Sequence, residues 1–176
     1  MKRKAIIIST IALLVLTVGI SMAWFSDRES VGNEFNMGTV EVEVLEPGFE
    51  APSDIQVGPE YDKKVQVKST GSKKTYVRVK LIPEWSEPSL PVSNVKFNLA
   101  QNNDWVAGGD GYYYYKHVLN EGETTSLLLE SVTFTSLGPE YEGQTLTIKA
   151  IAEGVQITHE AWKSVWGIDK LPWDSN

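Results

Sequence analysis

The chain has no cysteine and only two histidines among its 176 residues. The absence of cysteine excludes a disulfide scaffold, a thiolate metal site and a cysteine nucleophile, so stability must come from packed side chains. His159 and Glu160 begin an H-E-x-x pattern, but a zinc site of this type needs a second histidine one helical turn later. That position holds Lys163, whose ammonium group would repel the metal, and His117 lies in a tyrosine-rich segment. We therefore expect no bound metal and no cofactor.

Sequence patterns of other enzymes are also missing. No serine lies in a G-x-S-x-G sequence, the signature of one large class of serine hydrolases. Acidic residues are abundant, but Glu41 and Glu43 alternate with valines, so we expect them on the solvated face of a strand and not in a glycosidase pair. We predict that the protein is not an enzyme and has no catalytic residues.

Basic residues are few relative to acidic ones. The chain contains 16 Lys and Arg against 23 Asp and Glu, which gives a formal net charge of −7. Three of the basic residues lie in the first four positions, so the part after residue 23 carries 13 − 23 = −10. Because a strongly acidic protein repels nucleic acid and anionic lipid, we expect neither as a partner.

The amino-terminal residues carry the pattern of an export signal. Lys2, Arg3 and Lys4 precede an uncharged, mostly apolar run over residues 5–23. Basic residues stay on the cytoplasmic side, and the small residues of Ser21-Met22-Ala23 suit a signal peptidase. We expect cleavage between Ala23 and Trp24, and secretion to the extracellular matrix or cell surface. The alternative is retention of the run, which is long enough to span a bilayer, with membrane contact through this segment alone.

Two short motifs follow the apolar run. The first is Ala23-Trp24-Phe25-Ser26-Asp27, and the second is Phe35-Asn36-Met37-Gly38-Thr39-Val40-Glu41-Val42. Together they resemble the export and start signature of the TasA and camelysin family of Gram-positive bacteria, over about the first forty residues. The resemblance implies processing by a SipW-type signal peptidase and assembly into extracellular fibres of a biofilm matrix. It also raises metalloprotease activity, described for camelysin, which the single H-E-x-x pattern does not support.

The rest of the chain is dominated by period-two alternation, which indicates strands. Strands are predicted over residues 39–45, 63–68, 76–82, 95–99, 105–106, 112–117, 124–129, 132–135 and 145–156, with turn residues between them. One short helix is expected over residues 160–166, with Ala161, Trp162, Val165 and Trp166 at helical spacing and Gly167 ending it. This pattern indicates an all-β fold, an antiparallel two-sheet sandwich of jelly-roll type with one short C-terminal helix, preceded by an N-terminal signal helix. The expected organisation is a signal peptide over residues 1–23, a mobile segment over 24–37 and one domain over 38–176.

Large aromatic residues are frequent, and most are expected to fill the core. A run of tyrosines over residues 112–115 marks a strand with an aromatic side chain on each face. Trp85 lies in a proline-rich stretch and Trp173 in a polar tail, so these two are candidate surface aromatics for a sugar or a protein partner.

The segment released by cleavage is the candidate polymerisation element. Sandwiches have edge strands whose unpaired backbone groups accept another strand. Residues 24–37 could pair with such an edge on a neighbouring subunit, and a head-to-tail contact of this kind propagates a filament. The residues expected to fill pockets and fix the register are Trp24, Phe25, Val31, Phe35 and Met37. The expected partners are further copies of the chain and other matrix proteins; the alternative is a monomeric cell-surface or matrix-binding module that uses exposed aromatics.

Overall fold

The computed structural model describes residues 39–52 and 54–174, which belong to one unit that spans Gly38–Asn176. The expected signal segment, its cleavage position between Ala23 and Trp24, and the candidate polymerisation residues of segment 24–37 lie outside the described residues. The described part of the chain therefore corresponds to the expected sandwich domain alone.

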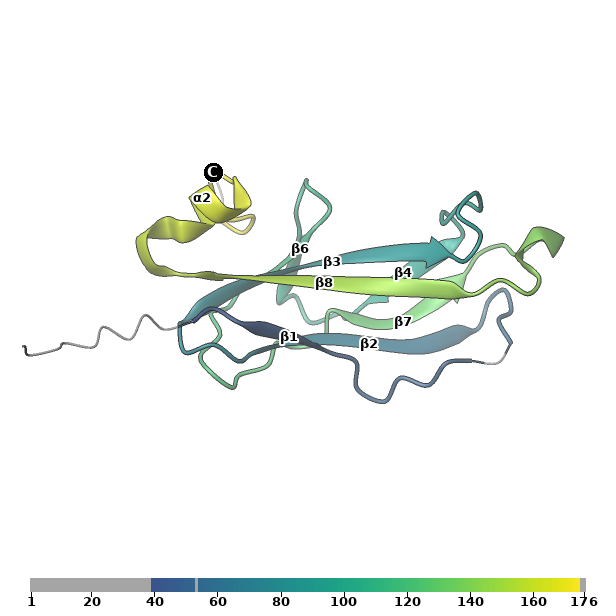
Figure 1. Cartoon of the computed structure of the whole chain (residues 1–176), viewed down its shortest axis with the longest axis horizontal. Helices are drawn as coiled ribbons and strands as arrows, with labels where there is room; N and C mark the ends of the chain where they lie inside the picture. The colour runs from purple at the N-terminus through teal and green to yellow at the C-terminus, as the bar shows by residue number, and fades with distance from the viewer. Residues whose placement is uncertain (1–38, 53, 175–176) are drawn as a thin grey trace, which may run out of the picture. The chain divides into compact units, whose positions relative to one another are not determined.

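The described residues form eight strands and one short α-helix (Figure 1). The strands are β1 (Val42–Leu45), β2 (Glu60–Ser69), β3 (Thr75–Trp85), β4 (Val95–Leu99), β5 (Trp105–Ala107), β6 (Tyr113–Tyr115), β7 (Leu129–Phe134) and β8 (Leu146–Gln156). The helix is α2 (Ala161–Trp166), and two 3₁₀ turns lie at Pro139–Tyr141 and Thr158–Glu160.

The strands form two four-stranded sheets, ordered β1-β2-β7-β4 and β5-β6-β3-β8. Every paired neighbour is antiparallel. The two sheets lie one above the other, as Figure 1 shows from the side. The prediction of antiparallel sheets with little helix is confirmed.

The main core lies between the sheets and follows the predicted alternation. Val77, Val79 and Leu81 of β3 point inward, and they meet Val65 and Val67 of β2 in one buried cluster. Fully burying a side chain of this size contributes about 1.5–3 kcal/mol, so this cluster stabilises the contact between the two sheets. Ile148, Ala150 and Ala152 of β8, the neighbour of β3 in the same sheet, pack against this cluster.

One predicted strand is wrong. Residues 124–128 form no strand, and β7 begins only at Leu129. The segment runs beside β2, but its hydrogen bonds are irregular because the Thr125 hydroxyl accepts the Val67 N–H in place of a backbone carbonyl. A threonine side chain that takes a ladder bond interrupts the backbone pairing that defines a strand.

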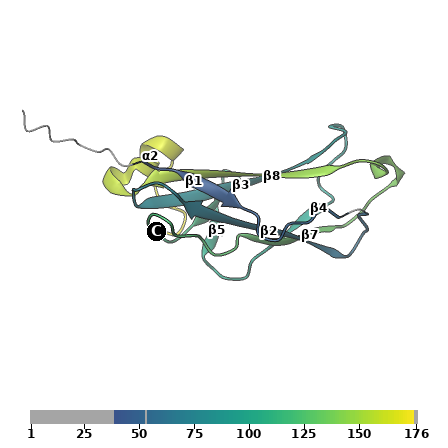
Figure 2. The same cartoon turned by 60° about the horizontal axis from the view of Figure 1, so that its bottom comes forward.

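The C-terminal helix packs on the outer face of the second sheet, where Figure 2 shows it beside β3 and β8. Trp162 and Trp166 are buried there against Tyr114, and Gly167 ends the helix with a φ of 67°. Val165, predicted on the same apolar face, is 62% exposed. The helix is only six residues long, so its buried face holds the two tryptophans and leaves Val165 in solvent.

Candidate functional site: an open cleft between the sheets

The two sheets are closed at one end of the domain and open at the other. At the closed end, β1 pairs with residues Gln66 to Ser69 of β2 and also lies against β8. Contact with β8 is so close that a Cβ at Gly154 would come within 2.9 Å of a Val42 methyl group. At the open end, β1 has ended and the space between the sheets is a cleft of about 1080 Å³.

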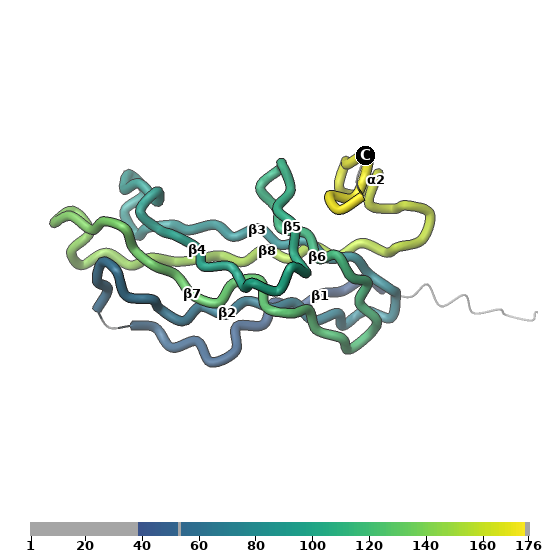
Figure 3. The backbone as a smooth tube through the Cα atoms, turned by 180° about the vertical axis from the view of Figure 1, so that it is seen from behind, coloured from purple at the N-terminus to yellow at the C-terminus, as the bar shows by residue number. Residues whose placement is uncertain are grey.

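The end of β1 explains why the cleft is open. Pro47 lacks an N–H group, and Gly48 adopts a φ of 70°, so the chain turns away from the sheet directly after Leu45. The following coil runs alongside β2 without becoming a strand, as Figures 1 and 3 show. Residues 60–65 of β2 are consequently left without a strand on that side, among the strands that the structure describes.

A second unpaired edge faces the same cleft. Among the described strands, β8 pairs only with β3, so its other side carries free N–H and C=O groups. Residues Leu146 to Ile148 of β8 line the cleft. Two open edges, one from each sheet, therefore border the same cavity, and each of them can accept a strand.

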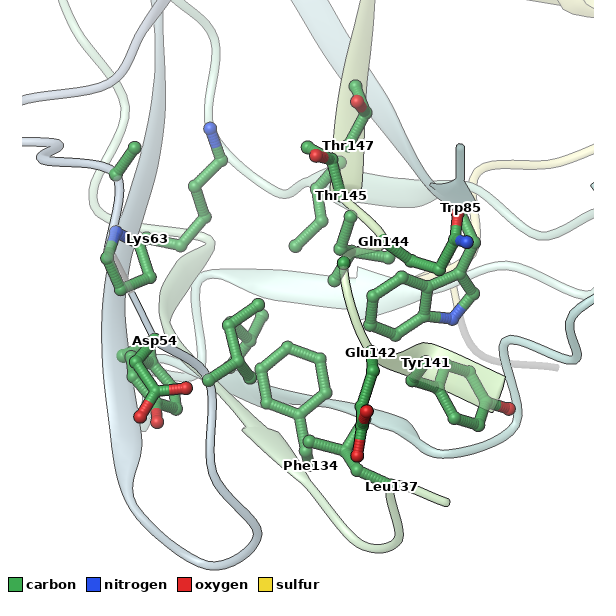
Figure 4. Close-up of a pocket in the computed structure, with 18 of the residues that line it drawn as sticks. Asp54, Lys63, Trp85, Phe134, Leu137, Tyr141, Glu142, Gln144, Thr145 and Thr147 are labelled. Atoms are coloured by element: carbon green, nitrogen blue, oxygen red, sulfur yellow. The ribbon is translucent and has the colours of Figure 1, made fainter. Parts of the chain in front are cut away.

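The cleft has an aromatic lining. The centre of the Phe134 ring lies 5.8 Å from the ring centre of Tyr61 and 6.0 Å from that of Trp85. The ring centres of Trp85 and Tyr141 are 4.9 Å apart. Figure 4 shows Phe134, Trp85 and Tyr141 along the cleft, with Lys63 and Asp54 on the other side. Phe134 and Trp85 are 2% and 5% exposed, so these two rings lie beneath the cleft, whereas Tyr61 and Tyr141 are half-buried and are the rings that an incoming side chain can reach.

Lys63 is the one lysine among the described residues that lines the cleft. It lies where the register of β2 against β7 shifts, between Asp62 and Val65, and a bulge of this kind re-aims side chains. Its side chain is only 8% exposed, and its Nζ lies 2.6 Å from Glu46 and 4.0 Å from the centre of the Phe49 ring. The other charged side chains of the lining are acidic and include Asp54, Asp62 and Glu142.

A second charged cluster surrounds Arg78 on the outer face of the second sheet. The guanidinium donates to Glu153 at 2.8 Å and 3.0 Å and to the Tyr114 hydroxyl at 3.0 Å. It also pairs with Asp110 at 3.3 Å and lies 4.0 Å from the centre of the Tyr112 ring. Every nitrogen of the guanidinium thus has a protein partner, so the cluster acts as a structural clamp.

The pKa values within this clamp follow from its hydrogen bonds. Burial by itself raises the pKa of Glu153, but the hydrogen bonds from Tyr112 and Arg78 outweigh it, so the pKa lies below its ordinary value. The same balance holds for Asp110, where burial raises the pKa and the hydrogen bond from Tyr114 helps to bring it below the ordinary value. Both carboxylates are therefore stabilised in their charged form.

The structure places the two predicted surface aromatics differently from expectation. Trp85 is 5% exposed, so the prediction of a surface tryptophan is wrong: the loop expected there is the end of β3, and the ring packs inward on Phe134 and Tyr141. Trp173 is half-buried, with its ring 5.6 Å from Tyr76. Trp173 is therefore partly accessible, and its role as a surface aromatic stays a prediction.

Neither histidine lines the cleft. His117 is within 3.0 Å of Asp104 on the surface, while His159 lies in the turn before α2 with a φ of 56°. Glu160 pairs with Lys163 at 2.7 Å. Within the described part of the chain, no group of three or more His, Asp or Glu side chains converges in a way that could hold a metal ion.

Sequence reasoning missed Lys63, the cleft and the Arg78 clamp. A signal for Lys63 was present, because it shares the alternation of the inward Val65 and Val67, and a lysine at such a position needs a partner. The cleft had no such signal. It depends on where β1 stops relative to β2, and this register is a tertiary property.

No protein-family model, no curated protein and no solved structure matches the chain. Of the residues that the structure describes, none forms a helix long and apolar enough to cross a membrane.

Proposed function

We propose that this protein is a secreted structural subunit of an extracellular matrix fibre, in which residues 24–37 of one subunit add as a strand to the open cleft of the next. The observation that carries the proposal is the cleft itself, which is bordered by unpaired edges of β2 and β8 among the described strands and lined by aromatic rings. Backbone hydrogen bonds to an edge would supply affinity, and side-chain pockets would supply register.

The two ends of the domain have different roles in this proposal. The described chain begins beside the turn after β2, where the Thr39 N–H donates to Ser72 at 3.2 Å and the Thr39 carbonyl accepts from Lys73 at 3.1 Å. The cleft lies at the other end of β2, because its lining includes Tyr61, Asp62 and Lys63. The donor segment would start from one end of the domain, and the cleft that accepts it lies at the other end. Contacts between such ends are head-to-tail, so they can continue from subunit to subunit as a filament.

The length of the donor segment suits the cleft. Fifteen residues, 24–38, precede the described chain after the expected cleavage, and an extended chain of that length reaches roughly 50 Å. The open edge of β2, residues 60–65, needs only about 20 Å of strand. Because β1 already runs toward the cleft, the preceding segment would have to reverse its direction to fill the cleft of its own subunit.

The side chains of the donor segment suit the lining. Trp24, Phe25, Val31 and Phe35 are large apolar residues, and the half-buried apolar side chains of the lining include Tyr61, Tyr141 and Ile148. Exposure of Trp24 as the new terminus requires cleavage after Ala23, which the resemblance to the TasA and camelysin family assigns to a SipW-type signal peptidase. Export, processing and assembly would then occur in that order.

Strand pairing also supports a jelly-roll description of the sandwich. β3 pairs with β6, and β2 pairs with β7. Along the chain, the second pair therefore encloses the first, and the connection between β4 and β5 lies at the centre. A jelly roll is wound from a long hairpin that contains such nested pairs.

A truncation tests the proposed assembly. A chain that begins at Trp24 should form filaments visible by electron microscopy, and a chain that begins at Asn36 should remain monomeric. The shorter chain should still show a cooperative thermal unfolding transition, because it keeps every residue of the two described core clusters. Filaments from the shorter chain would contradict strand addition by residues 24–37.

A monomeric binding module is the second candidate, and the composition of the cleft favours it specifically. Gln144, Thr145 and Thr147 bring amide and hydroxyl groups to the same cavity as the aromatic rings. Aromatic faces with polar groups at their rim suit sugar rings. Sedimentation velocity of the chain from Trp24 and a glycan-binding screen separate the two candidates, since a module of this kind stays monomeric and binds a glycan.

A further inference from the structure

The coil that follows β1 contributes one side of the cleft. Residues 46–52 run alongside the open part of β2, and Glu46, Phe49, Ala51 and Pro52 line the cavity. Among the described residues, this coil makes no backbone hydrogen bond to β2. Pro47 and Pro52 have no N–H group, so the coil cannot complete the strand ladder that β1 leaves unfinished.

Two side chains of the coil, Glu46 and Phe49, hold it in place, and both contact Lys63. Glu46 forms the ion pair at 2.6 Å, and the Phe49 ring lies against the same ammonium group at 4.0 Å. Phe49 is otherwise 43% exposed, so its position depends on this contact more than on burial. A nearly buried ammonium group needs a carboxylate, which makes Glu46 the residue that keeps Lys63 satisfied.

The proposed donor segment carries the group that could replace Glu46. Residues 24–37 contain three carboxylates, Asp27, Glu29 and Glu34, and a single basic side chain, Arg28. An incoming strand of this composition brings a negative charge to Lys63 as it pairs with residues 60–65. The ammonium group can therefore exchange one carboxylate for another without being left unpaired.

We propose that residues 46–52 are a self-inhibitory strap: Lys63 holds the strap against the open edge of β2 in the free subunit, and the incoming strand displaces it by supplying its own carboxylate to Lys63. This inference rests on the proposed function, since it assigns a regulatory role to the acceptor site. The strap covers an edge that would otherwise pair indiscriminately with exposed strands. Its displacement makes strap opening part of the barrier to assembly.

Substitution of Glu46 tests the strap. Glu46→Gln removes the charge that holds the strap but leaves Lys63 available to the incoming carboxylate. Assembly of the chain from Trp24 should then be at least about tenfold faster, as expected for the loss of one charge-assisted hydrogen bond. Phe49→Ala should also accelerate assembly, and as a half-exposed coil residue it leaves the core intact. The matched control is Glu50→Gln, the same change of charge at an exposed residue of the same coil, which should assemble at the wild-type rate.

Hydrogen exchange of residues 46–52 gives the second readout. Exchange in this segment should rise when wild-type subunits assemble and should already be raised in unassembled Glu46→Gln. Filaments that grow at equal rates in all variants, or that form with unchanged exchange in the segment, would overturn the strap and leave strand addition standing. Absence of filaments from every variant would instead overturn the proposed function, and the strap with it.

Discussion

At the scale of single residues, two buried cations organise different parts of the molecule. Arg78 is surrounded by fixed partners, with Glu153 and Asp110 as carboxylates and Tyr112 as a stacked ring. Lys63 has Glu46 as its carboxylate among the described residues and a partly exposed ring beside it. The first arrangement holds the outer surface of the second sheet, and the second is the contact that the proposed strap mechanism requires to change partners.

The Arg78 clamp predicts a dependence of stability on pH. Because the pKa values of Glu153 and Asp110 are lower in the folded state, their contribution is fully present above the unfolded pKa of about 4 and is lost as pH falls through the folded pKa. Glu153→Gln should lower the free energy of unfolding at pH 7 by about 1–2 kcal/mol and reduce its decline toward pH 3. Urea denaturation at the two pH values measures both effects.

The control for this prediction lies on the same two strands. Glu84 pairs with Lys149 on the surface, where both side chains are 53% exposed, so Glu84→Gln should change the free energy of unfolding by less than about 0.5 kcal/mol. If Glu153→Gln and wild type lose stability with the same slope toward low pH, the assigned role of the carboxylate is wrong.

At the scale of elements, the short strand β1 decides which half of the sandwich is closed. Close backbone contacts fix its start: a Cβ at Gly71 would collide with the backbone of Thr39 and Glu41. Its end is fixed by Pro47 and Gly48. The four paired residues between them leave the remaining edge of β2 open.

A substitution at Gly71 tests this anchoring. Gly71→Ala places a methyl group against backbone atoms that have little room to move, so it should destabilise the domain by about 1–3 kcal/mol. The loss should be concentrated in β1, where hydrogen exchange should rise more than in β3. Gly109→Ala is the matched control, because a Cβ there meets no atom within 4 Å; equal effects of the two substitutions would contradict the account.

Alternation in the sequence predicted most elements because it reflects burial directly. In β3 and β8, every second residue faces the core, and the predicted strands over 76–82 and 145–156 are confirmed with slightly different ends. The tyrosine strand is also confirmed, with Tyr115 in the main core and Tyr114 in the outer cluster. The pattern wrongly predicted a strand at Thr125, because the side-chain hydroxyl takes a hydrogen bond that a backbone carbonyl would take in a strand. It also wrongly predicted that Val165 is buried, because the helix is too short to bury more than its two tryptophans.

The candidate site was predicted less completely. The sequence indicated a donor segment by its aromatic residues and an acceptor edge only in general terms. Which edge is open depends on the pairing of β1 with Gln66 to Ser69, and the burial of Trp85 depends on the extension of β3 into the expected loop. Both are long-range contacts between residues far apart in the chain, for which local patterns carry no signal.

At the scale of the whole molecule, the proposed assembly depends on the two ends of the domain. The described chain begins beside the turn after β2, and the cleft opens at the other end of that strand. Repetition of one contact between such ends gives a filament with a single direction, in which only the terminal subunit keeps an empty cleft and the strap closed. The acidic surface of the domain would keep free subunits soluble until assembly.

The most direct measurement of the central claim is a cryo-electron microscopy reconstruction of filaments grown from the chain that begins at Trp24. The account predicts an added strand in each cleft, alongside residues 60–65 of β2, with continuous density to the Thr39 of the neighbouring subunit. A cleft that is empty in the filament, or filled by residues 24–37 of its own subunit, would contradict it.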